Sequence, residues 1–155
     1  MTLEQLCCSI ESAKRLRELG VKKDTLFYWV VPSDNMKWSS ARIKESNGNK
    51  YNIEMLHKYY DGVNGNELYP AYTAAELLEV LPWRINSIDE HGSKAAYTQR
   101  ILKYHQMIWV VYQNHFNDNY KALIMRESEN LAEACALCLI NLLENNLVSL
   151  EEVNR

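Results

Sequence analysis

The sequence predicts an α+β fold: an antiparallel sheet of hairpins packed by an N-terminal and a C-terminal helix. Amphipathic helical patterns stand near both ends of the chain, while runs of β-branched and aromatic residues separated by polar turns occupy the middle. With 155 residues, 47% hydrophobic and 24% charged, the chain has the composition of one globular domain, 1–155. A domain of this size needs neither a disulfide nor a metal for stability.

The first helix is predicted to follow Ser9, an N-cap residue, and to end before Gly20. Apolar residues recur between them at helical spacing: Ile10, Ala13, Leu16 and Leu19. An earlier start stays open, because Thr2 followed by Gln5 makes a capping box.

The next elements read as strands. "TLFYWVV", ended by Pro32, is rich in β-branched and aromatic residues, and "WSSARIKES" can pair with it across the polar loop "PSDNMK". Residues 46–66 form a polar insertion, in which "NIEMLHKYY" fits either a short helix or a strand. We therefore expect a hairpin followed by a polar segment for which both a helix and a strand stay open as interpretations.

The middle of the chain continues with a short helix, Ala74 to Leu81. Thr73 and Glu76 form its capping box and Pro82 stops it. A short strand from Trp83 to Ile85 is then expected, before the polar loop "NSIDEHGS".

Residues 97–113, "YTQRILKYHQMIWVVYQ", allow two interpretations. Residues of high β-propensity on both sides of His105 and Gln106 suggest two strands and a tight turn. A helix fits as well, because four apolar residues follow helical spacing: Ile101, Tyr104, Ile108 and Val111. "NHFNDN" is a turn, "YKALIMRE" a strand, and a last major helix runs from Leu131 to Asn145, with "SLEE" capping a final turn.

The cysteines are predicted to fill the core rather than to bind a metal. Cys135 and Cys138 lie within the apolar stripe of the last helix, more than one turn from its N-terminus. "CALC" lacks the turn-forming residues of a zinc knuckle, and the adjacent Cys7 and Cys8 point in different directions along any regular element. We therefore expect four reduced thiols and no metal or other cofactor.

Catalytic motifs are absent from the sequence. It has no Gly-x-Ser-x-Gly, no P-loop and no glycine-rich dinucleotide fingerprint. The loop residues Asp89, Glu90 and His91 could hold a cation or act in acid–base chemistry, but a solvated turn explains them better. We expect a protein that is not an enzyme and has no catalytic residue.

Two groups of residues are candidates for binding. Ten tyrosines and four tryptophans suit half-buried interfaces, and four of the rings cluster in a Gly/Asn-rich region: Tyr59, Tyr60, Tyr69 and Tyr72. These rings could bind another protein or pack the loop onto the sheet. Basic residues near the first helix could instead neutralise phosphates: Lys14, Arg15, Arg17, Lys22 and Lys23.

Composition also bears on location. No run of about 18 apolar residues can cross a bilayer, and the first 20 residues turn polar after Ile10, unlike a signal peptide. A net charge of −3 argues against a protein that coats nucleic acid. We expect a cytoplasmic protein that does not bind membranes.

Three segments carry a family resemblance: "SIESAKRLRELGVKKDTLFYWV", "AYTAAELLEVLP" and "ENLAEACALCLINLLENNLV". In this order they resemble a family of small proteins of no assigned activity, encoded in phages, prophages and mobile regions of gut Bacteroidales. The resemblance covers most of the chain and implies a single-domain cytoplasmic protein acting within a mobile element or its host. It implies no cofactor or catalytic residue, and the longer polar middle of this chain, 46–66, departs from the family pattern.

The leading hypothesis is therefore a non-enzymatic accessory protein that binds another protein. A nucleic-acid-associated factor using the basic first helix is the alternative. An enzyme or metal protein using the Asp89–His91 loop is a second alternative.

Overall fold

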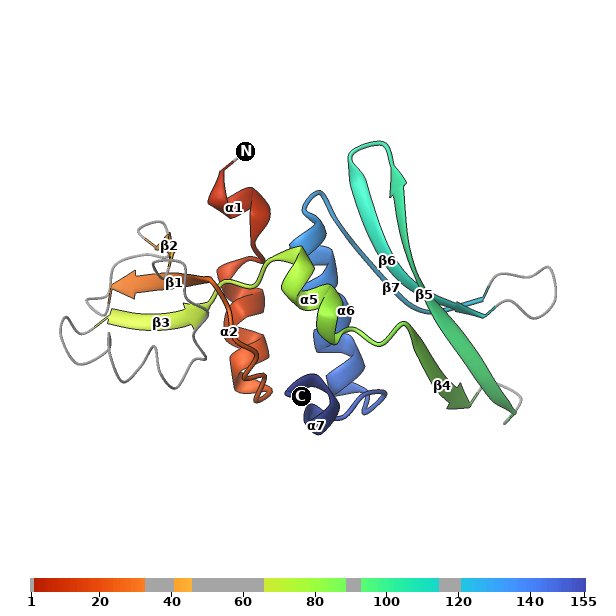
Figure 1. Ribbon diagram of the computed structural model, residues 1–155. Coiled ribbons are helices and arrows are strands. Elements are labelled where there is room, and N and C mark those ends of the chain that lie inside the picture. Colours follow the sequence, from red (N-terminus) through yellow and green to blue (C-terminus); the bar gives the residue numbers. More distant parts are fainter. Residues whose placement is uncertain (1, 33–40, 46–65, 89–92, 115–120) are drawn as a thin grey trace.

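The helices lie between two antiparallel sheets (Figure 1). The computed structural model describes residues 2–32, 41–45, 66–88, 93–114 and 121–155. The predicted α+β class is confirmed, but the strands form two sheets where one was expected. A core continuous from one sheet to the other joins them through the helices.

The first sheet has the strand order β2-β1-β3, with β1 (Phe27–Pro32) in the centre. It confirms the predicted pairing of β1 with β2 (Arg42–Glu45) and adds β3 (Asn66–Pro70) on the other side. Side chains of β1 are buried on both faces of the sheet, which explains why "FYWVV" reads as an unbroken apolar run.

Both predicted starts of the first helix are real, because they belong to two separate helices. Thr2 and Gln5 form the capping box of α1 (Leu3–Leu6), and the Ser9 side chain caps α2 (Ile10–Glu18). Gly20 follows α2 with φ of +90°, the conformation that favours glycine after a helix.

The remaining helices also begin where their capping residues predict. Thr73 and Glu76 cap α5 (Ala74–Val80), and α6 (Leu131–Glu144) ends one residue before the predicted Asn145. Ser149 caps α7 (Leu150–Val153). Helix α6 lies between α2 and the second sheet and buries most of its side chains, so it is the centre of the core.

The second sheet is a four-stranded meander, β4-β5-β6-β7. Its strands are β4 (Arg84–Ile88), β5 (Lys94–Tyr104), β6 (Met107–Asn114) and β7 (Lys121–Ser128). The two-strand interpretation of residues 97–113 is therefore right and the helical one wrong, with His105 at φ 55° in the turn. Strand β4 extends to Ile88, through residues that the sequence had assigned to a polar loop.

The two faces of the second sheet differ in their surroundings. One face packs on α6 and contributes Tyr97, Val110, Tyr112 and Ile124 to the core. The alternate side chains, including Leu102, point away from the helices, because successive residues of a strand face opposite sides. We call this side the outer face.

Two carboxylates hold the helices to neighbouring segments. Glu133 of α6 accepts hydrogen bonds from Ser9 N at 2.6 Å and Ser12 Oγ at 2.7 Å, and so ties α6 to the start of α2. Glu76, buried in the first turn of α5, accepts from the backbone N of Leu26 at 3.1 Å and of Thr73 at 2.8 Å. Each carboxylate satisfies buried donors and fixes where a helix lies.

None of the helices in the described part of the chain combines the length and apolar character needed to cross a bilayer. Three parts of the sequence prediction lie outside the described residues: the loop "PSDNMK" after Pro32 with the first three residues of "WSSARIKES", most of the polar insertion 46–66, and the Asp89–His91 loop.

Candidate binding surface

The basic residues of the first helix are engaged within the molecule. The Arg15 guanidinium lies 2.7 Å from the carboxylate of Glu144 and 3.3 Å from that of Glu18. Arg17 donates to the backbone O of Leu68 at 2.9 Å and stacks over a tyrosine ring. These contacts join α2 to α6 and β3, so the two arginines act as structural links.

The flanking lysines are placed similarly. Lys23 forms an ion pair with Glu79 at 3.0 Å, and both Lys14 and Lys22 have interaction partners. The structure therefore does not gather the five cations into an unpaired phosphate-binding patch.

The predicted tyrosine surface is not formed by the two tyrosines that the structure describes. Tyr72 is 0% exposed and Tyr69 6% exposed, so both rings belong to the core. The Tyr72 hydroxyl donates to the backbone O of Lys23 at 3.1 Å, and the Tyr69 hydroxyl donates to Glu67. Burial, followed by the Glu67 carboxylate, raises the pKa of Tyr69 to about 12. Tyr59 and Tyr60 lie outside the described residues.

All four cysteines are buried thiols, as the sequence predicted. Burial raises the pKa of Cys7, Cys135 and Cys138 to about 12, and it also raises the pKa of Cys8. A thiolate nucleophile or ligand needs the opposite shift. Over the described ranges, no group of three or more His, Cys, Asp and Glu residues could hold a metal ion.

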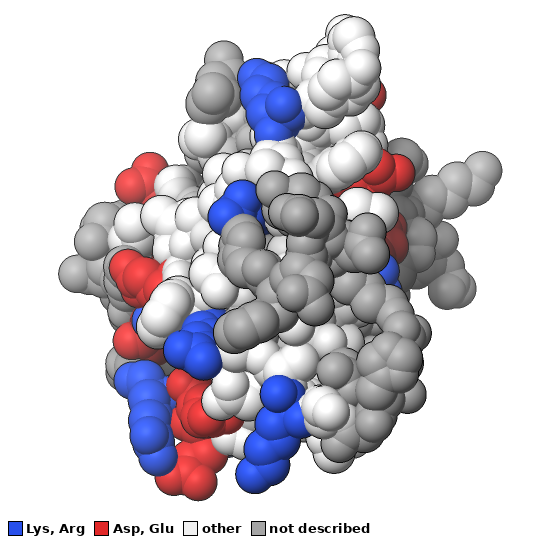
Figure 2. Space-filling model, turned by 90° about the vertical axis from the view of Figure 1, so that its right-hand side faces the viewer, with Lys and Arg blue, Asp and Glu red and all other residues white. Residues whose placement is uncertain are grey.

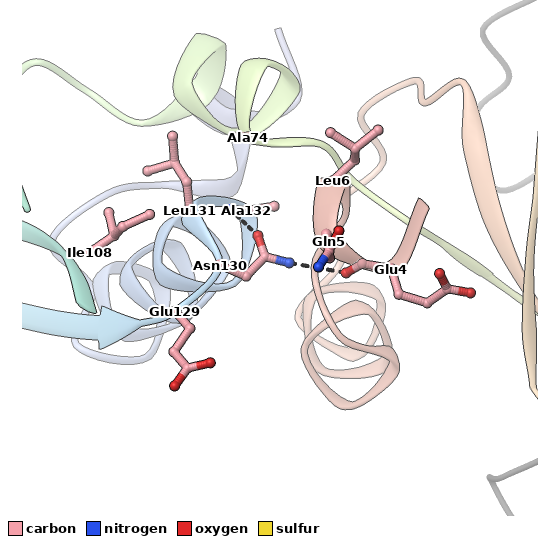
Figure 3. A pocket seen from close by; sticks show the side chains of 9 residues that line it. All are labelled: Glu4, Gln5, Leu6, Ala74, Ile108, Glu129, Asn130, Leu131 and Ala132. Carbon is pink, nitrogen blue, oxygen red and sulfur yellow. Dashed lines mark hydrogen bonds between the residues drawn. The ribbon is translucent and has the colours of Figure 1, made fainter. Parts of the chain in front are cut away.

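A cavity of about 610 Å³ opens between α1, α5 and the N-terminus of α6 (Figure 3). Leu6, Ile108 and Leu131 give it apolar walls, and the carboxylates of Glu4 and Glu129 lie at its rim. Asn130 is satisfied within the protein: its side-chain amide donates to the backbone O of Glu4 and of Cys7, and its side-chain O accepts from the N-terminal turn of α6. Among the described residues that line the cavity, none has a buried side-chain N or O atom without a hydrogen-bond partner.

The outer face of the second sheet carries several exposed apolar side chains. Six large hydrophobic side chains at least 38% exposed lie on the second sheet or next to it: Trp83, Ile88, Ile101, Leu102, Tyr104 and Met125. By strand register, Ile88, Leu102, Tyr104 and Met125 point to the outer face, whereas Ile101 points to the opposite one. Leu102 lies opposite Trp109, and Val111 lies opposite Met125, one step further along the same face. Together with Tyr104 and Met107 at the hairpin end, Leu102, Trp109 and Met125 define the outer-face patch, and Val111 between them is buried.

Cations border this patch. By strand register, Arg84, Lys94 and Arg100 point to the outer face, and the one acidic residue assigned to it is Glu127, opposite Trp109. Within the described chain none of the three cationic side chains has a hydrogen-bonding or ion-pair partner. Figure 2, which views the molecule from the side of this sheet, shows uncharged surface with separate basic and acidic groups around it.

Strand β5 is longer than its neighbour β4. Strand β4 pairs with Lys94–Thr98, and the bond from Gln99 N to Trp83 O at 2.9 Å follows this ladder. Beyond it, no strand of the described ranges lies beside Arg100–Tyr104 on the β4 side, although β6 pairs with these residues on the other. We call this segment the β5 edge.

Reasoning from the sequence missed both the outer-face patch and the β5 edge. A signal was present: Ile101 and Leu102 are consecutive, so in a strand one of them must face away from the core. The signal was easy to overlook, because Ile101 also fits the helical spacing that allowed a helix over residues 97–113. The unequal lengths of β4 and β5 left no trace in the sequence pattern.

Comparison of the chain with protein-family models, curated proteins and solved structures gives no match.

Proposed function

We propose that this protein is a non-enzymatic accessory factor that binds another protein through the outer-face patch. The observation that carries the proposal is the clustering of exposed Leu102, Tyr104 and Met125 on a sheet face that no described element covers. Contiguous exposed apolar surface is costly in water and marks interaction sites. In keeping with the family resemblance, the protein acts in the cytoplasm, within a mobile element or its host.

Two observations favour a protein partner over a nucleic acid at the first helix. Arg15 and Arg17 are committed to Glu144, Glu18 and a backbone carbonyl, so phosphate would have to displace existing bonds. The most exposed clustered side chains are aliphatic as well as aromatic, and aliphatic side chains offer bases no stacking platform.

The test compares three baits in affinity capture, each followed by cross-linking and mass identification. The baits are the unmodified protein, Leu102→Ser and the control Leu6→Ser. Leu102 and Leu6 are each 38% exposed, so the two substitutions remove equal apolar surface from different places. Thermal unfolding of all three verifies that the variants are folded.

The proposal expects a protein that the unmodified and Leu6→Ser baits retain and the Leu102→Ser bait loses, with cross-links near β5 or β6. If only the Leu6→Ser bait loses the partner, the binding site is the cavity of Figure 3 and not the outer-face patch. Loss after nuclease treatment of the lysate would replace the protein partner with DNA or RNA. A partner that all three baits retain equally would refute the role of the patch.

A further inference from the structure

The β5 edge offers an unoccupied strand position. Backbone groups along an antiparallel strand alternate between its two neighbours. Because Gln99 N points to the β4 side, the N–H and C=O groups of Ile101 and Lys103 point to that side too. Those of Arg100, Leu102 and Tyr104 are used by β6. Two residues therefore present a row of donors and acceptors to the empty side.

The side chains around this position are exposed and carry charge of one sign. All five residues from Arg100 to Tyr104 are exposed. Arg100 and Lys103 have no ion-pair partner in the described chain, and the segment contains no carboxylate. Lysine on an edge strand discourages indiscriminate pairing, since a second basic or neutral strand leaves the charge unmatched.

Charge also argues against a second copy of this chain at the edge. Antiparallel pairing of two β5 edges about Leu102 would bring four cations and no acidic residue into one short ribbon. A strand with carboxylates opposite Arg100 and Lys103 would complement both charges. Apolar residues opposite Ile101 and Leu102 would cover two exposed side chains, one on each face of the sheet.

We propose that the β5 edge binds an extended acidic segment of a partner protein, which adds to the second sheet as an antiparallel strand in line with β4. This inference rests on the proposed function, because the added strand lies at the margin of the outer-face patch and belongs to the same partner. Backbone bonds to Ile101 and Lys103 supply affinity, and the two cations select an acidic sequence.

The probe is the peptide Thr-Thr-Glu-Val-Val-Glu-amide with carboxyfluorescein on its N-terminal amine, and binding is measured by fluorescence anisotropy. In the antiparallel register its first glutamate lies opposite Lys103 and its second opposite Arg100. Methylating the backbone N of the first glutamate and second valine removes the two N–H groups that face β5. Because each of the two lost bonds contributes about 0.5 to 1.5 kcal/mol, affinity should fall by roughly 5- to 150-fold.

The matched control peptide carries its methyl groups on the first valine and second glutamate, whose N–H groups face away, and should bind as the parent does. Arg100→Glu combined with Lys103→Glu should abolish binding of the parent and create binding of a peptide with lysine in place of both glutamates. Amide exchange gives an independent readout: Ile101 and Lys103 should gain protection with the peptide, while Leu102 is protected with or without it.

Several results would overturn the inference. These are no binding of the acidic peptide, equal binding of both methylated peptides, or equal binding of the lysine peptide by the unmodified protein. An oligodeoxythymidylate that displaces the peptide and binds more tightly would assign the cations to nucleic acid instead. If any of these occurs while Leu102→Ser still loses its captured partner, the proposed function stands and only the added strand is refuted.

Discussion

The buried carboxylate of Glu76 provides the sharpest test of how this fold is held together. Its Oε1 accepts from Leu26 N at 3.1 Å, and its Oε2 accepts from Thr73 N and Thr73 Oγ1, each at 2.8 Å. The residue is 4% exposed, and Thr25 beside it is 1% exposed. Glu76→Ala therefore leaves buried hydrogen-bond donors without an acceptor, and water reaches these donors poorly.

The magnitude follows from these contacts. Hydrogen bonds to a charged group contribute about 1.5 to 3 kcal/mol each, and release of the buried charge offsets part of the loss. We expect Glu76→Ala to lower the free energy of unfolding by about 3 kcal/mol. For a domain of this size that corresponds to a Tm lower by roughly 6 to 12 °C.

The assay is urea unfolding followed by tryptophan fluorescence, with Glu152→Ala as the matched control. Glu152 makes the same capping box with Ser149 in α7, with bonds of 2.9 Å to the backbone N and to Oγ, but it is exposed. Its loss should cost much less, because water replaces the carboxylate. Equal destabilisation by the two substitutions would show that burial of the Glu76 network adds nothing.

Three further predictions concern buried groups. Glu133→Ala should destabilise the protein by about 2 to 3 kcal/mol in urea unfolding, because two donors of α2 lose a charged acceptor; a change below 1 kcal/mol would contradict this. Trp109→Phe should be nearly neutral, since its buried Nε1 has no partner, whereas Trp29→Phe loses a bond to a backbone carbonyl and should cost about 1 kcal/mol. The four thiols should resist Ellman's reagent at pH 8 until urea is added, and rapid labelling of the folded protein would disprove their burial.

The raised thiol pKa values also give the sign of a pH dependence. Above pH 9, the ordinary pKa of a thiol, the unfolded chain releases protons that the folded protein retains until about pH 12. The folded state then binds more protons, so its stability falls as pH rises through this window. Unfolding in urea at pH 8 and pH 10 measures the effect, and Cys138→Ala should reduce it.

Local features of the fold were predictable from the sequence. Thr2, Ser9, Thr73 and Ser149 all cap helices as their spacing predicts, because a capping side chain reaches only two or three residues along the chain. The strand pair around His105 was only one of two interpretations of residues 97–113, because β-propensity indicated strands while the apolar spacing also fitted a helix.

Relations between distant residues were not predictable. Arg15 looked available to phosphate because its partner, Glu144, lies 129 residues away. Tyr72 looked like an interface ring until packing placed it under the helices. The division into two sheets depends on which strands pair, and such pairs can be far apart in the sequence. The pairing of Trp29 with Tyr69, for example, spans the whole polar insertion.

Strand β5 is longer than β4 because of the way in which the chain connects α5 to β4. The segment that enters β4 arrives from α5 on the helix side of the sheet, and the Tyr112 hydroxyl holds it by donating to the backbone O of Pro82. Strand β4 begins where this segment first reaches the sheet, next to Gln99, and leaves the position beside Arg100–Tyr104 open. Extending it would therefore require a new connection from α5.

The central position of α6 has a consequence for biosynthesis. Both sheets are encoded before residue 131, yet the helix that completes the core between them comes after it. While a ribosome makes the chain from its N-terminus, the inner face of the second sheet and the side of α2 that packs on α6 emerge before α6 covers them. We expect nascent chains that stop short of Leu131 to remain sensitive to protease and dependent on chaperones, and the domain to close only when residues 131–144 have left the exit tunnel.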